Sequence, residues 1–379
     1  MKTTLIISLE YPPQVGGIAT YVHALAQALP PENTIVLAPP MVESEAWDKA
    51  QTYRVIRAPF LYPTFVWPRW WRLWREVKKL IKQEKIERIL LHHVLPVGYV
   101  AQLAARWYKI KFAVFSHGTD IALATRTKWK TKRLRQVLRR SDAVVFNSHS
   151  LMERAMAIVP EFRAKSGVIY PCPDEAFYSP PATIELEKIR AKFALEGKRV
   201  LLTVARLVDG KGFPHLIPIL ESVLKDNPNV VWIIIGSGPK TAEVVGLIQK
   251  HTLQNVVRFV GEVPHSELNI YYHLADVFAL LTHPDKGQEE GLGLVFLEAA
   301  AAGLPVIAGK SGGVEEGVQN NVTGYIFEVY NQKAEISAAI VNLLRDPQLS
   351  ERLGQAGQAR MRTEFSWSHQ LASLRAWLE

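Results

Sequence analysis

The chain has 379 residues, enough for two domains with separate cores, and 48% of its residues are hydrophobic, as is usual for a globular protein. No stretch approaches the ~18–20 uninterrupted apolar residues of a membrane-spanning helix. The N-terminal segment lacks the features of a signal peptide, and a single cysteine, Cys172, excludes an intrachain disulfide. These observations predict a cytoplasmic protein.

The positive charge is concentrated in the N-terminal half. Residues 1–180 contain 26 Lys and Arg against 14 Asp and Glu, a net charge of +12. Residues 181–379 contain 19 against 22, a net charge of −3, so the +9 of the chain comes from the first half. This asymmetry indicates a polyanionic partner for that half, either a nucleic acid or an anionic membrane surface.

Short apolar runs of strand type alternate with helical patterns along the chain. In the first half the predicted strands are Leu5–Leu9, Thr34–Ala38, Arg88–His92, Lys111–Ser116, Asp142–Asn147 and Gly167–Tyr170. In the second half they are Arg199–Val204, Val230–Ile235, Val257–Val260, Val277–Leu281, Pro305–Ala308 and Tyr325–Phe327. The alternation predicts α/β domains with parallel, doubly wound sheets, and the proline-rich stretch Pro171–Pro181 is interpreted as a linker.

Two loops after predicted strands in the first half carry candidate ligand-binding residues. Gly16 and Gly17 precede a helical pattern, and a glycine turn before a helix favours an anion. His117 directly follows a strand, where Asp120 is a candidate to orient its ring. The alternatives are an ordinary turn and a structural histidine. The neighbouring pair His92-His93 lacks metal-ligand spacing, and adjacent strand residues point to opposite faces.

A cationic loop follows the first predicted strand of the second half. Arg206 lies at the strand end and Lys211 five residues later in a loop that contains glycines. Both cations suit a diphosphate, although the spacing alone also fits two ordinary surface cations.

The stretch from Glu289 to Gly324 carries the most specific pattern. Glu290 and Glu298 are separated by seven residues and flank the candidate phosphate-binding residues Gly291, Leu292, Gly293, Leu294 and Val295. A glycine-rich turn and a helix N-terminus present N–H groups to a phosphate, whereas two carboxylates more plausibly accept hydrogen bonds from hydroxyls. This combination suggests a nucleotide sugar. The alternative is a buried helix with a tight entry turn and two solvated glutamates.

The order of these motifs resembles glycosyltransferase family 4, whose retaining enzymes have the GT-B fold. Glu290 and Glu298 match the E-x7-E motif of that family, and Gly303–Ala308, Gly312-Gly313 and Asn321–Gly324 follow in the family's order. The resemblance is strong from Val200 to Phe327 and looser before it.

The resemblance implies two Rossmann-like domains that face a central cleft. Residues 1–175 would form the acceptor-side domain, with the terminal helix 364–379 packing back on it, and residues 182–363 the donor-binding domain. Gly16 and Gly17 would lie over the donor diphosphate, and His117 beside the transferred sugar. The implied donor-diphosphate ligands are Arg206 and Lys211, with Glu290 holding sugar hydroxyls and Glu298 the ribose.

The implied reaction is transfer of a sugar from a nucleoside diphosphate sugar to an acceptor hydroxyl, with retention of anomeric configuration. No Asp-x-Asp occurs in the sequence, which favours a metal-independent enzyme with no cofactor beyond its co-substrate. The sequences of Glu290–Gly293 and of the loop at Gly16–Ile18 most resemble the corresponding motifs of mannosyltransferases that act on phosphatidylinositol mannosides. The expected donor is therefore GDP-mannose.

Two stretches of the first half point to an acceptor at a membrane. An amphipathic helical stripe contains Trp67, Trp70, Trp71 and Trp74, with Arg and Lys between them. Residues 126–140 contain no acid and eight cations, which include Arg126, Lys128 and Lys130. Tryptophans beside cations suit a lipid headgroup region, which predicts a peripheral protein with a lipid-linked acceptor and no nucleic-acid partner. The alternative places the tryptophan stripe in the domain core.

Three other functions share parts of this pattern. A GT-B nucleotide-sugar epimerase would bind the same donor without an acceptor. A sugar phosphorylase would use phosphate and a lysine-bound pyridoxal cofactor, for which the sequence offers no support. A catalytically inactive, basic membrane-binding module would keep the fold, although the intact Arg206, Lys211, Glu290 and Glu298 argue against it.

Overall fold

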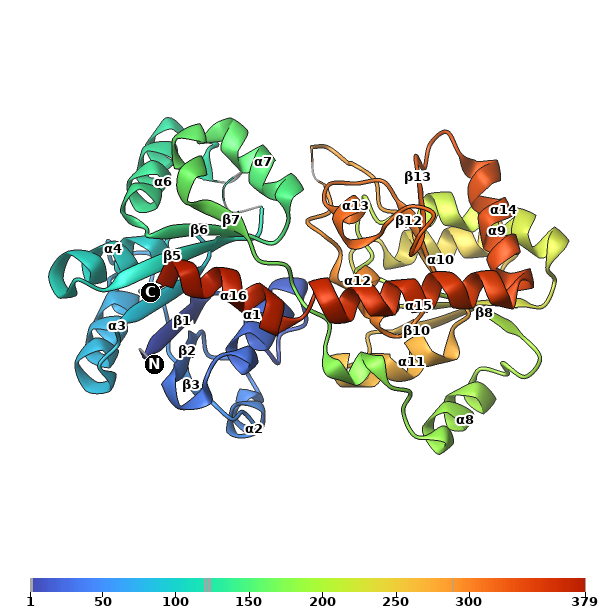
Figure 1. Ribbon diagram of the computed structural model, residues 1–379, viewed down its shortest axis with the longest axis horizontal. Helices are drawn as coiled ribbons and strands as arrows, with labels where there is room; N and C mark the ends of the chain where they lie inside the picture. Colours follow the sequence, from blue (N-terminus) through green and yellow to red (C-terminus); the bar gives the residue numbers. More distant parts are fainter. Residues whose placement is uncertain (1–2, 119–120, 122–123, 288, 379) are drawn as a thin grey trace. The chain divides into compact units, whose positions relative to one another are not determined.

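The computed structural model describes residues 3–118, 121, 124–287 and 289–378. It divides into two compact units (Figure 1). The first comprises Met1–Pro171 and Trp367–Glu379, and the second Cys172–Ser366. Each unit is a parallel α/β sheet with helices on both faces. Within the described residues, no helix has the length and apolar character needed to cross a membrane.

The sheet of the first unit has seven parallel strands in the order β3-β2-β1-β4-β5-β6-β7. The strands are β1 (Thr4–Ser8), β2 (Thr34–Ala38), β3 (Arg54–Arg57), β4 (Arg88–His92), β5 (Lys111–Ser116), β6 (Ala143–Phe146) and β7 (Ser166–Val168). The helices are α1 (Gly17–Ala28), α2 (Ser44–Lys49), α3 (Trp71–Glu84), α4 (Val97–Tyr108), α6 (Lys128–Arg140), α7 (His149–Ile158) and α16 (Trp367–Leu378). Short 3₁₀ turns lie at Pro31–Asn33 and Pro160–Lys165.

Both faces of this sheet are buried, because successive strand residues point to opposite sides. Leu5 and Ile7 of β1 pack in a core with α3, α4, α6 and α7, whereas Ile6 packs on the other side with α1. The terminal helix α16 joins that second face and contacts α1 (Figure 1). Strands buried on both sides appear in the sequence as continuous apolar runs, which is why most were predictable.

The tryptophans of the stripe lie in two different environments, some in the core and others at the surface. Trp74 is 2% exposed and belongs to the core, where its ring contacts those of Trp107 and Tyr108 on α4. Trp70 is half-buried against the same core. Trp74 therefore cannot face a membrane, and for this residue the prediction was wrong. Trp67 precedes the helix and is 86% exposed, and Trp71 is also exposed.

The sheet of the second unit has six parallel strands in the order β10-β9-β8-β11-β12-β13. They are β8 (Arg199–Val204), β9 (Val230–Ile235), β10 (Val257–Gly261), β11 (Val277–Leu280), β12 (Val306–Gly309) and β13 (Gly324–Phe327). The helices are α8 (Thr183–Lys192), α9 (Phe213–Asp226), α10 (Thr241–Lys250), α11 (Leu268–Leu274), α12 (Leu294–Ala301), α13 (Val314–Gly317), α14 (Lys333–Arg345) and α15 (Pro347–Glu364). Short 3₁₀ turns lie at Glu175–Tyr178 and His265–Glu267.

The stretch interpreted as a linker is largely packed structure. From Cys172 onward it belongs to the second unit. Phe177 is 1% exposed, and its ring meets those of His265 and Tyr272 edge to face. The four prolines of this stretch suggested a loose connection, but its aromatic residues anchor it to the second core.

A glycine at the start of α9 gives a stability prediction for the second unit. Gly212 has φ of +74°, and a Cβ at this position would overlap the carbonyl oxygen of Leu281. Gly212→Ala should therefore lower the free energy of unfolding by about 2–4 kcal/mol. Gly246→Ala is the matched control, since Gly246 lies in α10 with open space around it. It should raise stability by about 0.5–1 kcal/mol. Urea unfolding of both variants measures this; equal stabilities would contradict the conformational account.

Candidate functional site

The strand order of each unit marks one place where a ligand is expected. In both sheets the chain builds outward in one direction and then returns to the other side of its first strand. Such a switch point lies between β8 and β11 in the second unit and between β1 and β4 in the first. Ligands of open parallel sheets bind beyond the carboxyl ends of the strands at this point. The loops after these strands carry most of the candidate residues.

Lys211 and Glu290 meet at the switch point of the second unit. Lys211 follows β8 and Glu290 follows β11, and Lys211 Nζ lies 2.5 Å from Glu290 Oε2. Both side chains are mostly buried, at 24% and 17% exposed. The backbone N–H of Glu290 donates to Ser311 Oγ at 3.0 Å, and its carbonyl accepts from Gly313 N at 3.1 Å. The two predicted residues therefore form one fixed ion pair.

The turn after Glu290 leads into a helix whose first backbone N–H groups lack acceptors among the described residues. Helix α12 begins at Leu294, and its N-cap, Gly293, has no side chain to occupy the first amides. Gly293 has φ of +84°. The N–H groups of Leu294 and Val295 have no acceptor among the residues that the structure describes. The first turn of α12 contains no acidic residue, so the partial positive charge of the N-terminus is available to an anion.

Glu298 lies one turn into α12 and is 2% exposed. Its Oε1 accepts from His265 Nε2 at 3.0 Å, and its Oε2 accepts from the Tyr272 hydroxyl at 2.8 Å. Burial, with the charge of Glu298, holds the pKa of Tyr272 well above 10.0, so the hydroxyl remains a donor. A carboxylate oxygen has two lone pairs, so Glu298 keeps acceptor capacity for a further hydroxyl.

The pair of His265 and Glu298 predicts a pH dependence of stability. Burial alone would lower the pKa of His265, but the hydrogen bond to Glu298 and its charge, with a smaller contribution from Asp174, raise the pKa above 6.5. The stabilisation is therefore complete below the unfolded-state pKa and lost as pH rises through the folded-state pKa.

His265→Gln should cost more stability at about pH 5.5 than at about pH 9. Chemical unfolding of both proteins across this range measures the difference. A cost that is constant with pH would contradict the charged pair.

Arg206 and two further loops line the same end of the sheet. Arg206 follows β8, is exposed, and makes no ion pair with a described residue. The loop after β9 and the loop after β10 are joined by a hydrogen bond from Ser237 Oγ to Glu262 Oε1. The first of these loops contains Gly236 and Gly238, and the second follows Gly261, the last residue of β10.

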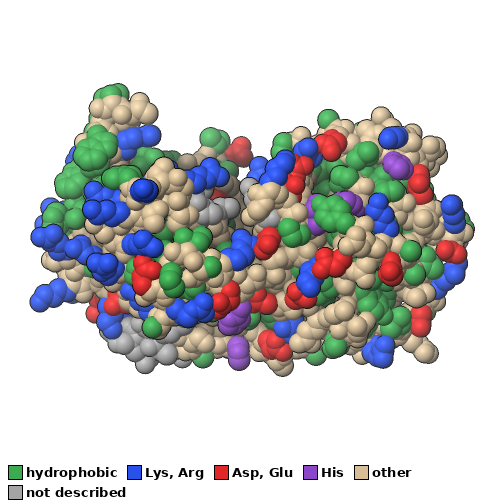
Figure 2. Space-filling view, turned by 90° about the horizontal axis from the view of Figure 1, so that it is seen from above, with side chains coloured by type: hydrophobic (Ala, Val, Ile, Leu, Met, Phe, Trp, Pro, Cys, Tyr) green, Lys and Arg blue, Asp and Glu red, His purple; other side chains and the backbone are tan. Residues whose placement is uncertain are grey.

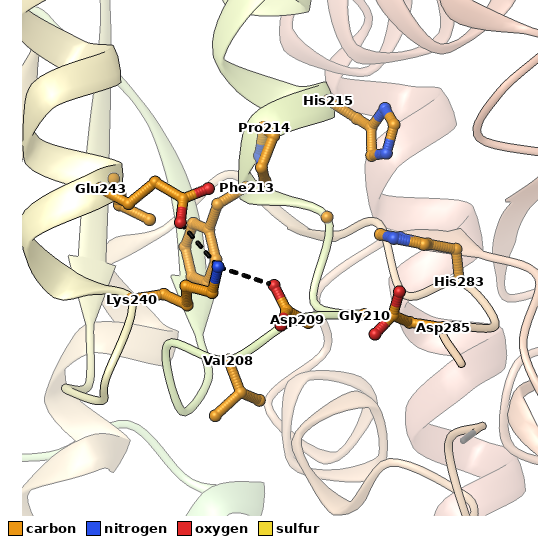
Figure 3. Close-up of a pocket in the computed structure, with 12 residues that line it drawn as sticks. Val208, Asp209, Gly210, Phe213, Pro214, His215, Lys240, Glu243, His283 and Asp285 are labelled. Carbon is orange, nitrogen blue, oxygen red and sulfur yellow. Dashed lines mark hydrogen bonds and ion pairs between the residues drawn. The ribbon is translucent and has the colours of Figure 1, made fainter. Parts of the chain in front are cut away.

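A small cavity lies beside the Lys211 loop (Figure 3). It is lined by residues of the β8–α9 loop, α10 and the loop after β11, and Lys240 bridges Asp209 and Glu243 there (Figure 3). Its volume of about 80 Å³ is far below the ~300–1,000 Å³ of ligand pockets. Its lining includes neither Glu290 nor Glu298. This cavity is therefore not the candidate nucleotide site.

In the first unit, three strand ends bring together histidines and an acid. His92 ends β4, His93 follows it, and His117 follows β5. His93 Nε2 lies 3.7 Å from Glu10 Oε1, across the switch point between β1 and β4. His93 has φ of +136°, which is rare for a residue other than glycine. His117 is half-buried, and burial, then the nearby His93, lowers its pKa to about 3. Asp120, predicted to orient His117, lies outside the described residues.

The glycine loop lies at the same switch point. Gly16 is the N-cap of α1, and Gly17 begins the helix. A Cβ added at Gly16 would lie 3.8 Å from Glu10 Oε2, which places this loop beside the acid that contacts His93. The first turn of α1 contains no acidic residue.

The cationic stretch of the first unit forms an open groove along α6. Its volume is about 460 Å³, and its lining includes Arg126, Lys128, Lys132, Arg135 and Arg139. Lys130 is also exposed on α6. Trp129 is 57% exposed, with the Arg133 guanidinium 5.5 Å from its ring centre. Figure 2 shows Lys and Arg side chains gathered with hydrophobic ones on the face of the first unit at left.

Comparison with known proteins decides the family. A model described as "Glycosyltransferase Family 4" matches residues 15–177, and one described as "Glycosyl transferases group 1" matches residues 185–360. The chain belongs to glycosyltransferase family 4. It is a retaining hexosyltransferase that uses a nucleotide sugar. Family 4 membership decides for a transferase over the epimerase, phosphorylase and inactive-module alternatives.

Several relatives of this family 4 enzyme match it over nearly their whole length. A "GDP-mannose-dependent alpha-(1-6)-phosphatidylinositol monomannoside mannosyltransferase" of Mycolicibacterium smegmatis is 29% identical, covering 96% of this chain and 94% of the relative. A related mannosyltransferase of Corynebacterium glutamicum, named for the monoacylated acceptor, is 28% identical over 97% and 95%. A glycogen synthase of Mycobacterium tuberculosis is 28% identical over 96% and 91%.

Solved structures confirm the predicted GT-B fold of the family 4 enzyme. Anabaena Alr3699/HepE, crystallised with UDP, has a TM-score of 0.81 at 18% identity, with 100% of this chain and 99% of that chain covered. A glycosyltransferase of Rickettsia africae has a TM-score of 0.82 at 19% identity, covering 99% and 98%.

Sequence reasoning missed the partners of the acids in this family 4 enzyme. His265 and Tyr272 lie 33 and 26 residues before Glu298, and Ser311 lies 21 residues after Glu290. None belongs to a motif quoted above. Tyr272 on α11 and His265 in the 3₁₀ turn before it reach Glu298 on α12, and Ser311 reaches Glu290 because it follows β12.

Proposed function

We propose that this enzyme transfers mannose from GDP-mannose to a hydroxyl of a lipid-linked acceptor, with retention and without a metal ion. The observation that carries the proposal is the match of GDP-mannose-dependent mannosyltransferases over nearly the full length of both chains. The glycogen synthase at similar identity makes a soluble glucan acceptor the second candidate.

The donor diphosphate is assigned to the switch point of the second unit. Lys211 has three N–H donors, so it can keep Glu290 and also donate to a phosphate oxygen. The amides of Leu294 and Val295, which have no acceptor among the described residues, and the glycine turn Gly291–Gly293 supply further donors. Arg206, exposed and without an ion-pair partner among the described residues, supplies a second cation.

These groups suit departure of the nucleoside diphosphate. Negative charge develops on the leaving phosphate as the glycosidic bond breaks, and fixed donors that point at it lower the barrier. Lys211 is already held by Glu290, so little reorganisation is needed when the charge develops. This fixed positive potential supports a mechanism that needs no metal ion.

The two acids are assigned to hydroxyls. Glu290 would accept hydrogen bonds from the mannosyl group, and the buried Glu298 from the ribose. In the first unit, His117 would contact the transferred sugar, and Gly16 and Gly17 would bind the diphosphate. Support for these roles comes from location. Gly16 and Gly17 follow β1 at the switch point of that sheet, and His117 follows β5, the strand beside β4.

A donor panel tests the proposal. Thermal shift and slow donor hydrolysis should be measured with GDP-mannose, GDP-glucose, UDP-glucose and ADP-glucose, each with and without EDTA. GDP-mannose should give the largest shift and the fastest hydrolysis, unaffected by EDTA. A preference for UDP-glucose or ADP-glucose would contradict the mannosyl assignment and favour the glucan alternative.

An anionic membrane is the proposed location of the acceptor, with the protein peripheral on the inner face of the cell membrane. The first half carries a net charge of +12, and Arg126, Lys128 and Lys130 are exposed beside Trp129. Trp67 and Trp71 add exposed apolar surface. Each cation near such a surface contributes about 1 kcal/mol, less at high salt.

Vesicle binding should require anionic lipid, weaken with ionic strength and decrease further in Trp67→Ala. Because Trp67 is 86% exposed, this substitution should leave thermal stability unchanged. Ile184→Ala on α8, where Ile184 is 74% exposed, is a control in the second unit and should bind normally. Sedimentation with neutral and anionic vesicles at physiological salt measures this. Protein that stays in the supernatant with both would indicate a soluble acceptor.

A further inference from the structure

Two imidazoles of the first unit share one hydrogen bond. His92 Nδ1 lies 3.1 Å from His117 Nε2. The planes of the two rings are 15° apart, and their centroids lie 5.4 Å apart. His92 ends β4, which pairs with β5, and it is fully buried against the ring of Phe115. The neighbouring strands therefore fix the orientation of both imidazoles.

Both rings are neutral at physiological pH. Burial, followed by the charges of His117 and His93, holds the pKa of His92 well below 6.5. Burial and His93 likewise lower the pKa of His117 to about 3. The other titratable groups nearby are Tyr21, whose ring edge contacts both imidazoles and whose hydroxyl donates to Ile169 O, and Glu10 beyond His93. Two neutral imidazoles place a single proton between the two nitrogens.

Nε2 of His92, the ring nitrogen outside the shared bond, determines which of the two rings donates the hydrogen of that bond. His92 Nε2 is buried and has no hydrogen-bond partner among the residues that the structure describes. A buried N–H without an acceptor is rarer and more costly than a buried acceptor without a donor. His92 therefore carries its proton on Nδ1 and donates to His117 Nε2. A neutral His117 must then carry its own proton on Nδ1.

We propose that His92 is a positioning residue that holds His117 in the Nδ1–H tautomer, so that His117 presents a neutral N–H donor to an oxygen of the ligand. The His92–His117 bond occupies Nε2, and no described residue forms a hydrogen bond with Nδ1 of His117. In this tautomer His117 cannot serve as a base toward the acceptor hydroxyl. It can stabilise an oxygen of the sugar or phosphate. The catalytic consequence rests on the proposed function of His117, whereas the tautomer does not.

Nitrogen NMR tests the tautomer directly on the full-length protein. Long-range ¹H–¹⁵N correlation spectra of the imidazole rings distinguish Nδ1–H from Nε2–H, and His117→Gln assigns the signals. His117 and His92 should both show a protonated Nδ1 and a bare Nε2. A His117 protonated on Nε2 would overturn the proposal.

Substitutions at His92 test the consequence for transfer. The amide nitrogen of asparagine is attached to Cγ, as Nδ1 is in histidine, so His92→Asn keeps a donor toward His117. His92→Asp offers only an acceptor, which forces the proton of His117 onto Nε2 and raises its pKa. Transfer with GDP-mannose should stay close to the wild-type rate in His92→Asn and fall about 10–100-fold in His92→Asp.

The pH profile and donor binding separate this role from a merely structural one. In His92→Asp the acid limb of the kcat profile should move to higher pH, whereas Kd for GDP should not change in either variant. Equal losses in the two variants with an unchanged pH profile would overturn the positioning role. A confirmed tautomer together with full activity of His117→Gln would instead overturn the proposed role of His117 itself.

Discussion

Glu290→Gln is expected to lower the rate of mannosyl transfer about 10–100-fold while leaving the affinity for free GDP unchanged or slightly higher. A hydrogen bond to a charged group is worth about 1.5–3 kcal/mol, which sets this range. The substitution keeps the shape of the side chain and the backbone contacts to Ser311 and Gly313. It removes only the charge, which also frees Lys211 to interact more strongly with a diphosphate.

Steady-state kinetics and calorimetry with GDP separate the two effects of this change. Glu289→Gln is the matched control, because Glu289 is the exposed neighbour on the same turn, and it should behave almost as wild type. A parallel loss of GDP affinity in Glu290→Gln would mean that the acid supports the nucleotide rather than the sugar. The assignment to sugar hydroxyls would then fail.

Lys211→Ala is expected to have the opposite signature, a loss of GDP affinity of about 5–150-fold, or ~1–3 kcal/mol. Two causes act together. The diphosphate loses a charge-assisted contact, and Glu290, 17% exposed, is left as an unpaired carboxylate near the phosphate. The second cause predicts that Lys211→Ala/Glu290→Gln binds GDP better than Lys211→Ala alone.

Calorimetry of GDP binding to the wild type, the two single variants and the double variant measures the lost phosphate contact and the effect of the unpaired Glu290 separately. Lys286→Ala is the control. Lys286 is a cation of the neighbouring loop, its side chain is 81% exposed, and its ion pair with Asp209 is long, with 3.9 Å between Nζ and Oδ2. It should change GDP affinity little, because exposed ion pairs are weak. Unchanged GDP affinity in Lys211→Ala would remove this lysine from the diphosphate site.

The strands of both sheets could be predicted because parallel strands covered on both faces contain continuous apolar runs. The strand that was missed, β3, shows why the rule has a limit. Arg54–Arg57 is an edge strand with half-exposed side chains and an arginine at each end, so its apolar run is only two residues long. The stretch at 171–181 does contain the division between the two units, at Pro171 and Cys172, but its prolines gave no sign that Phe177 packs in the second unit.

Helical periodicity identified the tryptophan stripe but not what covers it. The i, i+4 spacing puts Trp70 and Trp74 on one side of α3, and this side proved to be the one that α4 covers. A basic, tryptophan-rich helix looks the same in sequence whether its apolar side meets a core or a membrane. Trp67 lies outside the core because the helix begins only at Trp71.

The ligand-binding loops were predictable because their glycines and charges are local in sequence. Lys211 and Glu290, however, are 79 residues apart, and their contact depends on the switch in strand order. The pairing of His92 with His117 was not foreseen, since both were judged as separate strand-end residues. Such contacts follow from which strands are neighbours, which short apolar runs do not specify.

Analysis of the transfer product is the most direct test of the central claim. The enzyme should be incubated with GDP-[¹³C]mannose and vesicles that contain phosphatidylinositol mannosides, in EDTA, and the one-bond C–H coupling of the new anomeric centre measured. The proposed function predicts an α-linked mannosyl lipid, formed as fast with EDTA as without it. A β-linked product, a requirement for added metal, or transfer only from another nucleotide sugar would contradict it.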